Sequence, residues 1–119
     1  MELDDIDIGI LSFLADMPQS TTSTIAKALF KSPFNLRKMD MFIRYRLQRF
    51  QEDTLLKIVS RGRKKYYSVD SQKVLFGDGV LKMDGVGEVH MGYFIVIKKP
   101  NETVAISLDD YERRIKNFS

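Results

Sequence analysis

Residues 34–51, FNLRKMDMFIRYRLQRFQ, form the stretch that decides the fold. On a helical wheel its apolar residues fall within about 80° of arc, which is typical of an amphipathic helix with one buried stripe. The buried stripe is Leu36, Met39, Ile43, Leu47 and Phe50. The outer face carries Arg37, Lys38, Met41, Arg44, Tyr45, Gln48 and Arg49. The sequence therefore predicts a long helix whose solvent-facing side is rich in arginine and hydrogen-bonding side chains.

Two shorter helices are expected before this one. The first spans residues 3–17, with Asp4 or Asp5 as its cap and Pro18 limiting it. Its apolar stripe is Ile6, Ile10, Phe13, Leu14 and Met17. The hydroxyl-rich residues 19–22 suit an N-cap, and residues 24–30 predict a short second helix. Pro33 marks the break before the third helix, because helices tolerate proline only in their first turn.

Two β-prone runs follow the third helix. Residues 54–60 and 65–69 are rich in apolar, β-branched and aromatic side chains, and the basic segment 61–64 between them contains Gly62. Such a pattern predicts a hairpin with a basic tip.

The last third of the chain has a different character. Asp84-Gly85 predicts a tight turn between a strand at 79–83 and a strand that begins near residue 86. The run 93–97 predicts a buried strand, with Gly92 as a bulge or bend, and 103–107 predicts another extended segment. A final helix would carry Leu108, Tyr111, Ile115 and Phe118 on one face, either for core packing or, as we favour, for dimer contact. The chain is thus expected to be α+β, with residues 1–70 as one domain and 71–119 as an extension that serves dimerisation.

The charge of the chain is concentrated in its middle. The whole chain has a net charge of +3. Residues 31–69 hold eleven basic and three acidic residues, a net charge of +8, whereas the remainder carries −5. Such asymmetry indicates a surface for a polyanion, although a solvated basic face would give the same count.

Several classes of function are disfavoured by composition. The chain has no cysteine, which excludes thiolate zinc fingers, iron–sulfur clusters and disulfides. His90 is the single histidine, and Glu88 is its one nearby partner, which is too little for a metal site. We see no catalytic constellation, so neither an enzyme nor a cofactor is expected. Without a signal peptide or a membrane-spanning segment, a cytoplasmic protein is expected.

Residues 21–69 resemble the winged helix-turn-helix of prokaryotic transcriptional regulators, the broad group that includes ArsR- and MarR-like repressors. The resemblance rests on Thr22-x-Thr24-Ile25-Ala26-Lys27-Ala28-Leu29, on Leu47-x-x-Phe50, on Leu55-Leu56, and on Arg63-Lys64-Lys65-Tyr66-Tyr67-Ser68-Val69. Residues 3–17 match the extra N-terminal helix of such domains. The sequence departs from the pattern in its long connection at 30–35 and in Thr54, where such domains often have glycine.

The resemblance implies a regulator that binds double-stranded DNA with helix 34–51 in the major groove and wing 55–69 on the backbone or minor groove. The base-reading candidates are Arg37, Met41, Arg44, Tyr45 and Gln48. The candidates for backbone and wing contacts are Thr22, Lys38, Arg49, Arg61, Arg63, Lys64 and Lys65. A homodimer is expected because two copies can read a two-fold symmetric site, and the question of a small-molecule effector stays open.

Other interpretations remain beside this one. The same domain could serve a plasmid or viral replication or partition nucleoprotein, or act as a protein–protein adaptor. Tyr45 could pack against the wing, and Met41 could be exposed without a role. Arg46 lies nearer the buried edge, and it is expected to pair with Asp40, Glu52 or Asp53.

Overall fold

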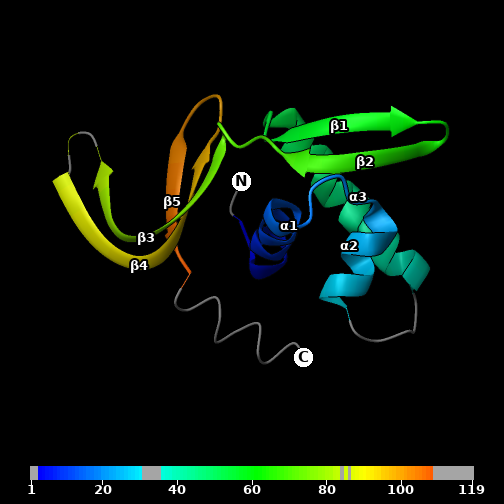
Figure 1. Cartoon of the computed structure of the whole chain (residues 1–119), viewed down its shortest axis with the longest axis horizontal. Coiled ribbons are helices and arrows are strands. Elements are labelled where there is room, and N and C mark those ends of the chain that lie inside the picture. The colour runs from blue at the N-terminus through cyan, green and yellow to red at the C-terminus, as the bar shows by residue number, and fades with distance from the viewer. Residues whose placement is uncertain (1–2, 31–35, 84, 86, 109–119) are drawn as a thin grey trace.

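A computed structural model of the chain describes residues 3–30, 36–83, 85 and 87–108. Its helices are α1 (Asp5–Asp16), α2 (Thr22–Leu29) and α3 (Leu36–Glu52). Its strands are β1 (Leu56–Arg61), β2 (Lys64–Val69), β3 (Val74–Met83), β4 (Gly87–Lys98) and β5 (Thr103–Ser107). Figure 1 shows the β1–β2 hairpin beside α3 and the β3–β4–β5 sheet at the other end of the molecule. The expected α+β class is confirmed, and three helices followed by a hairpin are compatible with a winged helix.

The first two helices begin where hydroxyl or carboxylate caps are available. Asp4 caps α1, and its side chain and that of Asp7 accept reciprocal backbone hydrogen bonds in a capping box. Thr21 caps α2 by accepting from the backbone N–H of Thr24, so α2 begins earlier than residue 24. The expectation that Met17 is buried was wrong: the helix ends at Asp16, and the Met17 side chain beyond it is 53% exposed.

The third helix buries the stripe that the sequence predicts. Ile43, Leu47 and Phe50 are fully buried and Met39 is half-buried, while the side chain of Leu36 is outside the described part. They pack with α1 and α2 residues in one core, which fixes the opposite side of α3 toward solvent. That core also includes Val74, Ile95 and Ile97 of the second sheet.

A Schellman motif ends α3 and starts the hairpin. The backbone N–H of Leu55 donates to the carbonyl of Phe50, and that of Thr54 donates to the carbonyl of Gln51. Thr54 has φ of 61°, in the left-handed region that a β-branched residue strongly disfavours. Thr54 is therefore strained at a position where glycine would adopt the same backbone conformation without steric cost.

Replacing Thr54 by glycine is therefore expected to stabilise the fold. Glycine relieves about 1–2 kcal/mol of left-handed strain in the folded state. It also raises the conformational entropy of the unfolded chain, which offsets part of that gain. We expect Thr54→Gly to raise the free energy of unfolding by about 0.5–1 kcal/mol. Urea denaturation measures this, with Thr54→Ala as the control that keeps the Cβ. A Thr54→Gly protein less stable than Thr54→Ala would contradict the assignment of strain.

The β1–β2 hairpin is a two-stranded antiparallel sheet with a two-residue turn. Arg61 pairs with Lys64, and Gly62 has φ of 63° at the first central position, as a type II′ turn requires. Ser20 adds a short third pairing on the other side, because its backbone N–H and carbonyl both bond to Tyr67. The hairpin is thereby fastened to the segment that precedes α2.

The second sheet has the order β3–β4–β5, with all pairs antiparallel. Its first strand begins at Val74 rather than at residue 79, whereas the expected strand at 103–107 is confirmed. Gly79 pairs with Gly92 but Val80 pairs with His90, so the expected bulge at Gly92 is confirmed. The final helix expected from Leu108 onward falls, apart from Leu108, on residues outside the described part of the chain.

None of the helices in the described part of the chain is long and apolar enough to cross a bilayer.

Candidate nucleic-acid interface

A polar groove runs between the outer face of α3, the β2 strand and the start of α2. Its volume is about 630 Å³. Ten described residues line it: Thr21, Thr22, Ser23, Arg44, Gln48, Gln51, Arg63, Lys64, Lys65 and Tyr67. Four of these are basic, and none of the described lining residues is a carboxylate. The groove thus combines positive charge with hydroxyl and amide groups, the chemistry that a polyanion with hydrogen-bonding edges requires.

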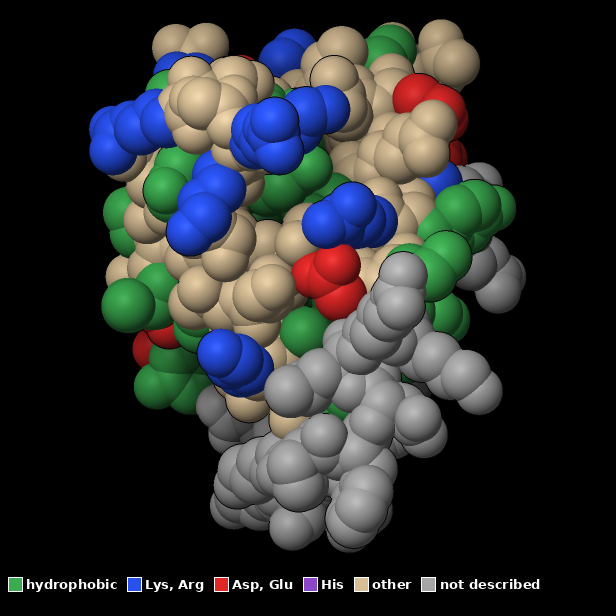
Figure 2. All heavy atoms as spheres, turned by 90° about the vertical axis from the view of Figure 1, so that its right-hand side faces the viewer, with side chains coloured by type: hydrophobic (Ala, Val, Ile, Leu, Met, Phe, Trp, Pro, Cys, Tyr) green, Lys and Arg blue, Asp and Glu red, His purple; other side chains and the backbone are tan. Residues whose placement is uncertain are grey.

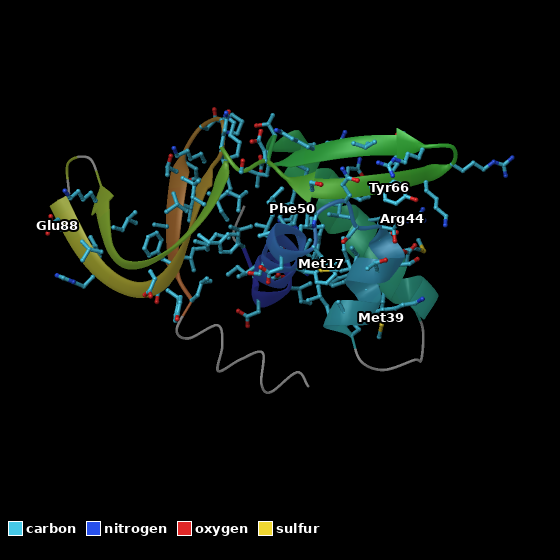
Figure 3. All side chains as sticks on the ribbon, in the orientation of Figure 1. Met17, Met39, Arg44, Phe50, Tyr66 and Glu88 are labelled. Carbon is cyan, nitrogen blue, oxygen red and sulfur yellow. The ribbon has the colours of Figure 1, made fainter. Side chains whose placement is uncertain are left out.

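The amphipathic pattern of α3 supplies the floor of the groove. Arg44 and Gln48 are one turn apart, so they lie on the same helix face, beside the buried stripe that contains Ile43 and Leu47. Both side chains are exposed, and Figure 3 shows Arg44 on α3 beneath the hairpin. Two adjacent donors are therefore held on a rigid helix with their ends in solvent.

The start of α2 supplies the second wall. Thr21, Thr22 and Ser23 lie at the N-cap and the first two positions of the helix, where backbone N–H groups lack partners within the helix. This end of a helix carries partial positive charge. It therefore adds to the attraction of the groove for anions without a charged side chain.

The β2 strand and its turn supply the third wall. Arg63, Lys64 and Lys65 are exposed, and Tyr67 stands two residues beyond Lys65 on the same face of the strand. Burial raises the pKa of the Tyr67 phenol above its ordinary value; the nearby Arg44 opposes this shift and Asp40 adds to it. Tyr67 therefore remains a neutral hydrogen-bond donor at physiological pH.

The basic side chains gather at one end of the molecule. Figure 2 shows lysine and arginine side chains spread over the face that includes the hairpin and α3. Glu88, by contrast, lies at the far end of the β3–β4 hairpin (Figure 3). The lysine and arginine side chains of the hairpin and α3 thus share one face of the molecule.

The structure brings together six of the twelve predicted DNA-contact residues in this groove. They are Thr22, Arg44, Gln48, Arg63, Lys64 and Lys65. Met41 and Tyr45 are exposed on α3 outside the lining, and the Tyr45 ring, 63% exposed, lies under the Arg49 guanidinium rather than against the hairpin. Arg61 bonds to Gln19 and stacks on Tyr66, also outside the lining. The side chains of Arg37 and Lys38 are outside the described part.

Four lining residues were missed at the sequence level. They are Thr21, Ser23, Gln51 and Tyr67. Period-two alternation from Lys65 would have indicated Tyr67, because both side chains stand on one face of β2. The sequence indicates only a capping role for Thr21. The helix starts at Thr22 rather than at residue 24, which brings Ser23 into its first turn.

The expectation for Arg46 was right about burial and wrong about partners. Its side chain is 10% exposed, and its guanidinium bonds to Asp4 and, at 2.7 Å, to Asp7 of α1. None of Asp40, Glu52 and Asp53 fills this role. The guanidinium also lies over the Phe42 ring, 4.4 Å from its centre. Arg46 thus joins α3 to α1 and takes no part in the groove.

Of the residues proposed for dimer contact, the described one is Leu108. It is half-buried and packs against the core, and its backbone N–H donates to the carbonyl of Tyr93. Tyr111, Ile115 and Phe118 lie outside the described residues.

No family model, no curated protein and no solved structure matches this chain.

Proposed function

We propose that this chain binds double-stranded DNA with sequence preference, in the manner of a winged helix, as a prokaryotic transcriptional regulator. The observation that carries the proposal is the groove, in which the exposed face of a long helix, a basic hairpin and a helix N-terminus converge. Each of these three elements suits a different part of a duplex.

The reading element in this proposal is α3. The major groove of B-DNA is about 12 Å wide and admits one α-helix. Arginine pairs with the N7 and O6 acceptors of guanine, and glutamine pairs with N7 and the amino group of adenine. Arg44 and Gln48, one turn apart, would read neighbouring base pairs, with Met41 and Tyr45 offering apolar contact to thymine methyl groups.

The hairpin and α2 hold the duplex in this proposal. Arg63, Lys64 and Lys65 neutralise phosphates beside the major groove, and the start of α2 donates backbone N–H groups to another phosphate. Such contacts set the position of the protein on the duplex, and base contacts then set its preference.

A single reader of this size covers few base pairs. We therefore propose that two copies act together on a site with two-fold symmetry, with their reading helices in successive major grooves about 34 Å apart. A protected footprint that contains two half-sites with this spacing is the sign of such a pair.

A titration of duplex DNA tests the proposal. The full chain is added to a labelled 30-base-pair duplex with a randomised core, and fluorescence anisotropy is recorded in 50 and 200 mM salt. We expect binding whose affinity falls by more than about tenfold over this range, because Lys and Arg contacts release counterions.

Two results would contradict the proposal. One is the absence of binding at 50 mM salt. The other is binding that does not respond to salt, which would indicate contacts without phosphates. A long footprint that grows cooperatively along the duplex would instead favour an architectural nucleoprotein over a regulator.

A further inference from the structure

Arg44 is held by a neighbouring carboxylate on its own helix. Its Nε lies 3.0 Å from Oδ2 of Asp40, four residues earlier. The arginine side chain is 66% exposed, whereas the aspartate side chain is 20% exposed. The pair therefore has an inner member and an outer member, and the outer member extends into the groove.

Asp40 is poorly placed to contact a ligand itself. Its Oδ1 is buried and has no hydrogen-bond partner in the described part of the chain. Its Oδ2 is engaged by Arg44. A carboxylate beside a groove for polyanions would also repel phosphate, so its presence calls for a role other than direct binding.

We infer that Asp40 is a positioning residue that makes Arg44 a reader of guanine rather than a phosphate contact; this inference rests on the proposed DNA binding. With Nε bonded to Asp40, the two terminal nitrogens are the pair that can donate to N7 and O6 of one guanine. An arginine held in this way loses less rotamer freedom on binding than a mobile one.

The negative charge has a second effect on Arg44. A mobile arginine in this groove could turn to any phosphate within reach, and such contacts carry no sequence information. Asp40 limits this movement, and its charge disfavours phosphate at the same place. Specificity is therefore expected to depend on Asp40 although Asp40 touches no base.

The test selects bound sequences from a randomised duplex pool. The full chain is used in five forms: wild type, Arg44→Ala, Asp40→Asn, Asp40→Glu and Glu52→Gln. Glu52→Gln is the matched control, because it removes one carboxylate charge from the far end of the same helix. Affinities are then measured for the selected duplex and for the same duplex with each guanine replaced in turn. Circular dichroism and thermal melting check that every variant is folded.

We expect the wild type to select a guanine that Arg44→Ala no longer selects. Asp40→Asn should reduce the preference for that guanine about tenfold, while its affinity for the substituted duplex stays equal or rises. Asp40→Glu, which keeps the charge at the same helical spacing, should retain part of the preference. If Asp40→Asn does not fold, Asp40→Glu alone tests the inference. A guanine preference weaker than that of the wild type then supports it, and an unchanged preference contradicts it.

Several outcomes overturn the inference. If Asp40→Asn keeps the guanine preference within twofold, the carboxylate only stabilises the helix, and the proposed function stands without it. If Arg44→Ala selects the same sequence as the wild type, Arg44 does not read a base. If the wild type binds no duplex, the proposed function fails first, which the titration above shows separately.

Discussion

Replacing Arg46 by methionine is expected to destabilise the fold by about 3–5 kcal/mol, the usual effect of breaking a buried ion pair on one side. Methionine keeps the apolar stem of the side chain without the guanidinium, and it leaves the carboxylate of Asp7, which is 1% exposed, without its cation. Arg44→Met is the matched control: it removes from the same helix an arginine that is 66% exposed and whose partner Asp40 is 20% exposed, and we expect it to cost about 1–2 kcal/mol.

Urea denaturation of the two variants measures this difference. The double variant Arg46→Met/Asp7→Leu removes both charges and should recover most of the loss, apart from the capping bond that Asp7 accepts from the backbone of Asp4. If Arg46→Met unfolds within 1 kcal/mol of the wild type, the ion pair does not join α3 to α1 in the way described.

The second ion pair of Arg46, with Asp4, predicts how stability responds to acid. Burial by itself raises the pKa of Asp4, but hydrogen bonds from Arg46 and the backbone of Asp7 outweigh it and lower the pKa below its ordinary value. A lowered pKa in the folded state adds stability that is present above the ordinary aspartate pKa of about 3.9 and is lost as the pH falls toward the folded value. Because Arg46→Met lacks the share of this contribution that Arg46 supplies, the difference in free energy of unfolding between the variant and the wild type should shrink below about pH 4.

Removing the three basic residues at the hairpin tip is the second large change. We expect Arg63→Gln/Lys64→Gln/Lys65→Gln to weaken duplex binding about a hundredfold at 0.15 M salt, and to lower the slope of log affinity against log salt by about 2.7. Each phosphate contact contributes about 0.9 to that slope. The loss should be similar for all sequences, because these side chains are proposed to contact phosphates.

The control removes equal charge elsewhere. Lys73, Lys82 and Lys98 lie on or next to the β3–β4–β5 sheet, away from the groove lining. Their triple glutamine variant has the same net charge as the hairpin variant, so a general effect of charge would weaken both equally. Equal losses in the two variants, or an unchanged salt slope in the hairpin variant, would contradict the proposed interface.

α3 and the hairpin beside it could be predicted from the sequence because their signals are local. The stripe that contains Ile43, Leu47 and Phe50 repeats at helical spacing, and burial of these residues leaves Arg44 and Gln48 on the exposed side. The hairpin follows equally from two β-prone runs around Gly62. The groove lies where these local elements meet.

The partners of Arg46 could not be predicted in this way. Proximity along the chain draws attention to Asp40, Glu52 and Asp53, but the actual partners lie 39 and 42 residues earlier in the chain. Asp4 also had a sufficient local explanation as a helix cap, which concealed its second role. Only the packing of α1 against α3 brings the three charges together.

The fixed corner after α3 has a consequence for how a duplex would be recognised. Leu55 is fully buried, its N–H bonds to Phe50 at the end of the helix, and its carbonyl accepts from Asp70 just beyond β2. Both ends of the hairpin are therefore anchored at one residue, which ties the base of the hairpin to the end of α3. If the chain binds DNA as proposed, a hairpin fixed to α3 in this way would leave the bending to the duplex, and base pairs that the protein never touches would then influence affinity through their stiffness.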